Sequence, residues 1–186
     1  MLCGPCWRQI DFLGAPMCGA CGLPFSFDPG LVEDVLCGAC ARHRPPYERA
    51  RAVMAYGDFS RKLILAFKHG DRTDTAPALS RWLAASGRDL IADAEVIAPV
   101  QDLLVRRKRT PPQGRLSRSA RRRNVRGAFK VHAARREGLA GRRVLLIDDV
   151  LTTGATVQAC AEVLLRAGAK AVDVLTLARV VRAEQE

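Results

Sequence analysis

The sequence predicts an α/β protein whose mainly parallel sheet is flanked by helices and preceded by a small cysteine-rich module. After about residue 48, apolar strand-like runs alternate with helical patterns, which is typical of βαβ units. The run RRVLLIDDV, at 142–150, is apolar enough to be buried on both faces, as strands of parallel sheets are. Six of the seven cysteines lie in the first 40 residues as three Cys-x-x-Cys pairs, which define the separate module.

The strands are predicted from short apolar runs that lie between turn or helix signals. RRVLLIDDV and AVDVLTLARVV are the longest of these runs, and GAFKVH is the shortest. The predicted strands cover residues 50–56, 94–100, 127–132, 142–150 and 171–181.

Two helices are predicted between the first two strands. The first covers 60–70, with Ser60 as its N-cap and Gly70 at its end. The second covers 76–92, where apolar residues recur on one helical face, although Gly87 weakens its second half.

The length and composition predict one ordinary domain with a small appendage. The chain has 186 residues, of which 48% are hydrophobic. Paired prolines at 45 and 46 suggest a boundary there, so we expect a zinc-binding module at 1–47 and the α/β domain at 48–186. No apolar run approaches the roughly 18 residues of a membrane helix, and no secretory signal pattern opens the sequence. We therefore expect a cytoplasmic protein without membrane insertion.

The positive charge of the chain is concentrated in one segment. The net charge is +11, and residues 106–126 contribute ten Lys or Arg and no acid, which leaves +1 for the remainder. Such a segment predicts a local anionic partner, and single-stranded DNA is one candidate. No aromatic residue is interleaved in this run, so base stacking by the segment is not supported. A solvated loop remains the alternative.

The cysteine spacing predicts a structural zinc site. Two Cys-x-x-Cys turns separated by 15 residues, Cys18/Cys21 and Cys37/Cys40, match a ribbon-type site with four thiolate ligands. The pair Cys3/Cys6 has three interpretations: it shares that site, it binds metal at an interface, or it is orphaned, and the last is preferred. Cys160 is expected to be inert packing in a helix.

Two adjacent acids predict a ligand site in the second half of the domain. Asp148 and Asp149 are expected to end a buried strand, and the segment 152–156 leads into a helix over 156–167. The backbone N–H groups of such a loop favour a phosphate, and Gly154 allows its close approach. Carboxylates repel phosphate but accept hydrogen bonds from sugar hydroxyls. The combination predicts a phosphorylated sugar, whereas capping of a helix by the acids is the simpler alternative.

The segment VLLIDDVLTTGAT resembles the signature of type I phosphoribosyltransferases, which bind 5-phosphoribosyl 1-pyrophosphate. Together with the cysteine-rich N-terminus, FKHGDR at 67–72 and RTPPQGRLSRSARRRNVRGAF, it makes the chain similar to the ComF family in particular. That family joins a double zinc ribbon to a phosphoribosyltransferase-like domain and is associated with DNA uptake in natural transformation. The resemblance covers nearly the whole chain.

The resemblance implies a role for each motif. Asp148 and Asp149 would be the catalytic carboxylates that hold the ribose 2′- and 3′-hydroxyls, and Mg²⁺ would bridge ribose and pyrophosphate. The basic segment would then be a flap over pyrophosphate, a DNA contact, or both. The loop for the 5′-phosphate would consist of Thr152, Thr153, Gly154, Ala155 and Thr156. Candidate contacts to pyrophosphate or DNA are Lys68, Arg106, Arg107, Arg121 and Arg122. For Lys68 the equal alternative is an ordinary cation that interacts with the dipole at a helix C-terminus.

The chain departs from the family pattern after the strand at 94–100. A pyrophosphate loop and a long helix should follow, but only Gln101 and Asp102 precede the next family motif, so one strand–helix unit is expected to be missing near 100–101. Three hypotheses stay open. The chain is a phosphoribosyltransferase with an unidentified acceptor, a non-catalytic DNA-binding protein that keeps the sugar-phosphate pocket as a sensor, or a shortened relative with neither activity.

Overall fold

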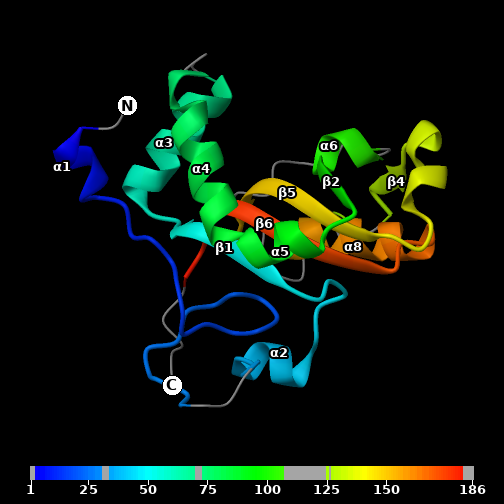
Figure 1. Cartoon of the computed structure of the whole chain (residues 1–186), viewed down its shortest axis with the longest axis horizontal. Helices are drawn as coiled ribbons and strands as arrows, with labels where there is room; N and C mark the ends of the chain where they lie inside the picture. The colour runs from blue at the N-terminus through cyan, green and yellow to red at the C-terminus, as the bar shows by residue number, and fades with distance from the viewer. Residues whose placement is uncertain (1–2, 31–33, 70–72, 107–124, 126, 182–186) are drawn as a thin grey trace.

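The computed structural model describes residues 3–30, 34–69, 73–106, 125 and 127–181. Its centre is a parallel sheet of four strands in the order β1–β6–β5–β2 (Figure 1). This arrangement confirms the predicted α/β fold. The strands are β1 (Ala50–Ala55), β2 (Val96–Pro99), β5 (Arg143–Leu151) and β6 (Ala171–Arg179).

Helices cover both faces of the sheet. On one face, α8 (Ala155–Arg166) packs in a core that contains Val144 and Leu146 of β5. On the other face, Leu145 of β5 packs against Leu90. Successive β5 side chains therefore point into opposite helical layers, which is why this strand is apolar over its first half. The second layer consists of α3 (Asp58–His69), α4 (Ala76–Ser86) and α5 (Arg88–Asp93).

Two helix predictions need correction. The first helix begins at Asp58, so Ser60 is not its N-cap; instead the Ser60 hydroxyl, inside the first turn, accepts the N–H of Gly57 at 2.8 Å. The second predicted helix is divided at Gly87 into α4 and α5. A Cβ at Gly87 would lie 2.5 Å from Cδ2 of Leu175, so the close approach of helix and sheet requires glycine there.

Two strand predictions also differ from the structure. The strand predicted at 127–132 is β4 (Phe129–Val131), and it pairs antiparallel with β3 (Leu104–Arg106) in a separate small sheet. The strand that carries the two acids continues to Leu151, because its last residues still pair with β6. Asp148 and Asp149 therefore lie inside β5 rather than at its end. After β2 the chain turns at once into α6 (Val100–Leu103).

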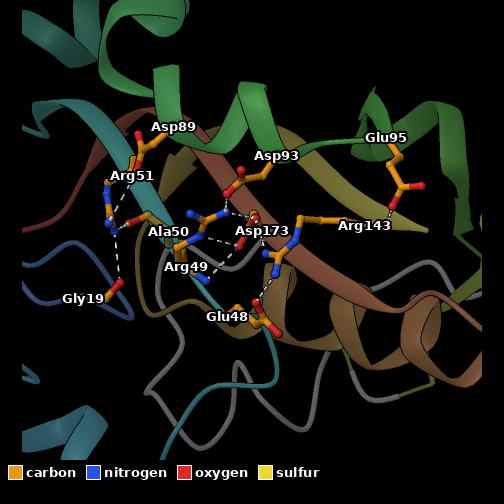
Figure 2. A network of polar contacts seen from close by, with 10 residues as sticks. All are labelled: Gly19, Glu48, Arg49, Ala50, Arg51, Asp89, Asp93, Glu95, Arg143 and Asp173. Carbon is orange, nitrogen blue, oxygen red and sulfur yellow. Dashed lines mark hydrogen bonds and ion pairs between the residues drawn. The ribbon is translucent and has the colours of Figure 1, made fainter. Parts of the chain in front are cut away.

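The amino ends of the strands are joined by an ionic network around Asp173 of β6 (Figure 2). The Asp173 side chain is fully buried, and it accepts hydrogen bonds from Arg49 at 2.8 Å and from Arg143 at 2.8 Å. Hydrogen bonding to Asp173 raises the pKa of both arginines. The outer acids Asp93 and Glu48 pair with the same guanidinium groups, at 2.7 and 2.6 Å. At this end of the sheet, the charged side chains of the chain therefore pair with one another.

The cysteine-rich module rests on β1. The N–H of Ala50 donates to the carbonyl of Ala20 at 2.7 Å, and the N–H of Leu13 donates to that of Val53 at 2.9 Å. Among the described residues, no helix combines the length and the apolar character needed to cross a membrane. The remaining short elements are α1 (Gly4–Trp7), α2 (Gly38–Arg42), η1 (Thr73–Thr75), η3 (Ala133–Arg135) and η4 (Glu137–Leu139).

Candidate functional site

The adjacent acids of β5 lie on the carboxyl side of the parallel sheet. β2 ends at Pro99 opposite Ile147, so Asp148 and Asp149 continue past the end of that neighbour. β6 still flanks them on the other side, where Asp148 pairs with Thr176. Ligands of open parallel sheets bind at this end of the strands. The acids thus occupy a position where a ligand can reach them.

Lys68 forms an ion pair with Asp149 across the site. It lies near the end of α3 and contacts the Oδ2 atom of Asp149, and their side chains are 47% and 28% exposed. Burial opposes ionisation of Asp149, but its hydrogen bonds with Lys68 and Asp148 outweigh burial and lower its pKa. Asp149 is therefore ionised at neutral pH. The structure thus brings one of the predicted anion contacts beside the predicted carboxylates.

Asp148 has fewer stabilising partners. Its Oδ1 atom accepts the N–H of Asp149 at 2.9 Å, and among the described residues no cation pairs with it. Burial, followed by the negative charge of Asp149, raises the pKa of Asp148 to about 6. A ligand that brings hydroxyl donors or a metal ion would stabilise the ionised form of such a buried carboxylate.

The loop after β5 turns sharply into α8. Gly154 adopts φ +76° and ψ 0° at the N-cap position, a left-handed conformation that favours glycine. The N–H of Ala155 donates to the Thr153 hydroxyl at 3.5 Å, and Thr152 is exposed to solvent. Only residues 150–154 therefore separate the acid pair from the first N–H groups of α8, whose axis carries a dipole.

The other predicted anion contacts are not placed by the structure. Arg107, Arg121 and Arg122 lie outside the described residues, and the side chain of Arg106, at the end of β3, does too. Their assignment to pyrophosphate or DNA stays a prediction.

The four predicted zinc ligands are brought together. The sulfur atoms of Cys18, Cys21, Cys37 and Cys40 all lie within 4.8 Å of one another, and those of Cys21 and Cys37 are 3.7 Å apart. A tetrahedral site with Zn–S bonds of about 2.3 Å has S···S edges of about 3.8 Å. The donor set and its spacing fit Zn²⁺.

Backbone groups and one buried cation support these sulfurs. The N–H groups of Cys21 and Cys37 donate to Cys18 Sγ at 3.5 and 3.3 Å. The hydrogen bond with the Cys21 thiol, followed by backbone hydrogen bonds that outweigh burial, lowers the pKa of Cys18 to about 4. Arg179, at the end of β6, donates to the Cys21 carbonyl. A zinc ion with four thiolates carries a net charge of about −2, which a neighbouring guanidinium stabilises.

Sequence analysis missed Arg179. Its side chain is buried, with 7% of the residue exposed, although it is charged. The only signal was a basic residue inside the apolar run AVDVLTLARVV, which could equally have marked the end of a strand. Its position links the cysteine cluster to the central sheet.

The Cys3/Cys6 pair does not join the four-cysteine cluster. It lies on α1, and Figure 1 shows α1 well separated from α2, which carries Cys40. A hydrogen bond from the Cys6 backbone, and then one from its thiol, lowers the pKa of Cys3. In this structure, Cys3 and Cys6 therefore do not share the zinc site of the four-cysteine cluster.

Comparisons with known proteins match both parts of the chain. Residues 81–186 match the phosphoribosyl transferase domain, and residues 1–46 match the double zinc ribbon domain. The chain is 31% identical to the DNA utilization protein YhgH of Escherichia coli (strain K12) and 27% identical to competence protein F of Haemophilus influenzae. Each alignment covers 96% of this chain and 90% of the relative. This chain belongs to the ComF family. No solved structure matches it.

Membership of the ComF family supports the zinc assignment. The double zinc ribbon match contains Cys18, Cys21, Cys37 and Cys40, and the geometry of these four residues fits the same metal. The alignment with the YhgH relative is also informative about length. It extends over 215 residues, although this chain has 186, so the YhgH relative contains positions that this chain lacks.

Proposed function

We propose that this ComF-family chain binds 5-phosphoribosyl 1-pyrophosphate together with Mg²⁺ at the carboxyl end of β5. One observation carries the proposal: two adjacent carboxylates, of which Asp149 forms an ion pair with Lys68, stand one short loop before a helix whose N-cap is a glycine. Carboxylates bind hydrogen-bond donors and cations, whereas the N–H groups at a helix start bind anions. A ligand that occupies both must therefore carry donor groups and a negative charge. A phosphorylated sugar does so.

The carboxylates bind the ribose in this proposal. Ionised Asp148 and Asp149 only accept hydrogen bonds, and the 2′- and 3′-hydroxyls of ribose donate them. Mg²⁺ would be held beside Asp148 and Asp149 mainly by oxygens of the ligand and by water, and it would supply positive charge that neutralises the leaving group. Lys68 stabilises Asp149 through their ion pair, and in this proposal it also contacts a pyrophosphate oxygen.

The loop 152–156 binds the 5′-phosphate. Gly154 in its left-handed conformation allows the backbone to approach the phosphate, and Thr153 and Thr156 add hydroxyl groups at the start of α8. Transfer of the phosphoribosyl group would then proceed by loss of pyrophosphate from the anomeric carbon. The chain contributes positioning and electrostatic stabilisation to this step.

The proposed biological setting is DNA utilization or competence. The relatives are named for these processes, and residues 106–126 carry ten basic side chains that suit an anionic polymer. A second candidate function follows from the direct passage of β2 into α6, which leaves no room there for a separate pyrophosphate loop. In that case the chain binds single-stranded DNA and keeps the sugar-phosphate pocket as a sensor.

Calorimetric titration with 5-phosphoribosyl 1-pyrophosphate and Mg²⁺ tests the ligand. The double variant Asp148→Asn, Asp149→Asn should bind at least about 100-fold more weakly, because two pairs of charge-assisted hydrogen bonds are lost. Glu162→Gln is the control, since Glu162 is exposed on α8, where it pairs with Arg166 at 3.7 Å. Equal affinity of the double variant and the unmutated chain would refute the site.

Pyrophosphate release separates the two candidate functions. The zinc-loaded chain is incubated with the ligand, Mg²⁺ and a panel of bases and amines. Release above the uncatalysed rate, lost in the Asp148/Asp149 variant, identifies an enzyme. Tight ligand binding without release, combined with salt-dependent binding of single-stranded DNA, favours the sensor.

A further inference from the structure

We propose that Arg179 supplies the positive charge that balances the zinc-bound four-cysteine cluster, and that zinc occupancy thereby controls how firmly the carboxyl ends of β5 and β6 are held together. The inference concerns a side chain of the α/β domain that reaches into the cysteine-rich module. It does not depend on which ligand the acid pair of β5 binds.

The first zinc-ligand turn, at 18–21, is held by the sheet through three consecutive carbonyl groups. Each of these carbonyls accepts a hydrogen bond from the α/β domain, and Figure 2 shows one of the three. The pairs are the Arg51 side chain with Gly19 at 3.1 Å, the N–H of Ala50 with Ala20 at 2.7 Å, and the Arg179 side chain with Cys21. A Cβ at Gly22 would lie only 2.4 Å from the carbonyl oxygen of Ala50. The turn therefore packs backbone to backbone on β1.

Arg179 differs from Arg51 in having no acidic partner. It is 7% exposed, its Nε has no hydrogen-bond partner, and no carboxylate of the described residues forms an ion pair with it. Arg51, by contrast, pairs with Asp89 at 3.9 Å. A buried cation without a negative partner is strongly destabilising. Arg179 therefore requires a negative charge from another source.

The zinc-bound cluster supplies that charge. Zn²⁺ with four thiolates has a net charge of about −2, and Arg179 contacts the backbone of one of the four ligands. When zinc is removed, thiols of the cluster take up protons, so the negative charge beside the guanidinium decreases. The guanidinium and the cluster therefore stabilise each other most strongly while zinc is bound.

The backbone of Arg179 connects this charge pair to the carboxyl end of the sheet. Arg179 is the last residue of β6 and pairs with Leu151, the last residue of β5. The N–H of Val180 donates to the Leu151 carbonyl at 2.9 Å, and the N–H of Tyr56 donates to the Arg179 carbonyl at 2.7 Å. The loop 152–156 begins directly after Leu151. Displacement of Arg179 therefore loosens the strand end from which that loop begins.

Zinc affinity tests the charge pairing. The whole chain is loaded with zinc under reducing conditions, and its affinity is measured by competition with a chromogenic chelator. Arg179→Met should bind zinc about 10-fold more weakly because a buried charge pair is lost, whereas Arg179→Lys should retain part of the difference. Arg51→Met is the matched control. It removes a donor to the same turn, but its charge has an acid of its own, so the loss should stay below about threefold.

Hydrogen exchange tests the link to the sheet. Exchange of the segment 148–156 is followed by mass spectrometry, with zinc bound and after its removal by a chelator under reducing conditions. In the unmutated chain, zinc removal should raise the exchange rate of this segment about 10-fold, because Arg179 is left as a buried charge. In Arg179→Met, which buries no charge there, the rise should be below about threefold. Exchange within residues 1–47 should rise in both chains and reports that the zinc is gone.

The two measurements can each overturn the proposal. Equal zinc affinity of Arg179→Met and the unmutated chain would contradict the charge pairing, and so would an equal loss of affinity in Arg51→Met. Faster exchange confined to residues 1–47 after zinc removal from the unmutated chain would contradict the link to the sheet, and this result requires no variant to fold. An equal rise at 148–156 in the unmutated chain and in Arg179→Met would contradict it as well.

Discussion

The two ends of the parallel sheet differ in how many cationic partners their buried carboxylates have. At the amino end, Asp173 is fully buried and receives hydrogen bonds from both Arg49 and Arg143. At the carboxyl end, Lys68 forms an ion pair with Asp149, and no cation of the described residues forms one with Asp148. The first arrangement satisfies its charge within the fold. The second leaves acceptor capacity at the end of the sheet where ligands bind.

The difference shows why a charge in a strand does not by itself indicate function. Asp173 and Asp148 both interrupt apolar strands, and both lie in the two central strands of the sheet. What separates them is the set of cations provided by neighbouring elements. Arg49 precedes β1 and Arg143 begins β5, so folding itself brings both to Asp173.

Removing the charge of Asp173 should have the largest effect on stability. Asp173→Asn should lower the free energy of unfolding by about 3 kcal/mol, because two guanidinium groups lose their shared partner. The value lies at the lower end of the usual range since Arg49 and Arg143 remain partly exposed, at 25% and 23%, and can be hydrated. Urea denaturation with the zinc-loaded chain measures the change.

Asp93→Asn is the matched control for that experiment. Asp93 pairs with the same Arg49 but is 53% exposed, so its loss should cost less than about 1 kcal/mol. Similar losses for Asp173→Asn and Asp93→Asn would mean that burial does not distinguish the two acids, and the contrast between the ends of the sheet would fail.

At the carboxyl end, the effect should depend on pH and have the opposite sign. The pKa of Asp148 is raised to about 6 by burial and by Asp149, so the folded chain binds a proton there more tightly than the unfolded chain. The resulting stabilisation is complete below the ordinary aspartate pKa and is lost as the pH rises through about 6. Asn at position 148 cannot ionise, so the Asp148→Asn variant should not lose this stability as the pH rises.

Denaturation at several pH values measures this effect without ligand. Relative to the unmutated chain, Asp148→Asn should gain about 1–2 kcal/mol of stability between pH 4 and pH 7. Glu162→Gln, which changes an exposed acid, should show no such trend. A flat difference between Asp148→Asn and the unmutated chain would mean that the Asp148 carboxylate is not strained by its surroundings.

The sequence predicted the parts of this fold that depend on local pattern. The alternation of apolar strands and helices, the Cys18/Cys21 and Cys37/Cys40 pairs, and the motif around Asp148 were all visible in the order of residues. The family assignment rested on those same motifs and is confirmed by the comparisons.

Features that depend on distant contacts were not predicted. β5 extends to Leu151 because β6 continues to pair with it, and no local signal at Asp149 reveals that partner. The antiparallel pairing of β3 with β4 joins segments more than twenty residues apart in the sequence, so the short run at 127–132 could not show its sheet. The role of Arg179 is likewise set by the contact of the cysteine module with β6.

Replacing Lys68 should give the smallest change in stability and the sharpest test of the carboxyl end. Lys68→Met removes the cation that holds Asp149 ionised, but Lys68 is 47% exposed, so the free energy of unfolding should change by less than about 1 kcal/mol at neutral pH. Affinity for 5-phosphoribosyl 1-pyrophosphate with Mg²⁺ should nevertheless fall about 10-fold, because a lost charge-assisted contact costs about 1.5 kcal/mol or more. Lys62→Met, on the same helix, is the control and should leave both quantities unchanged. If Lys68→Met destabilised the chain as strongly as Asp173→Asn without altering affinity, Lys68 would belong to the fold, and both ends of the sheet would serve the same structural purpose.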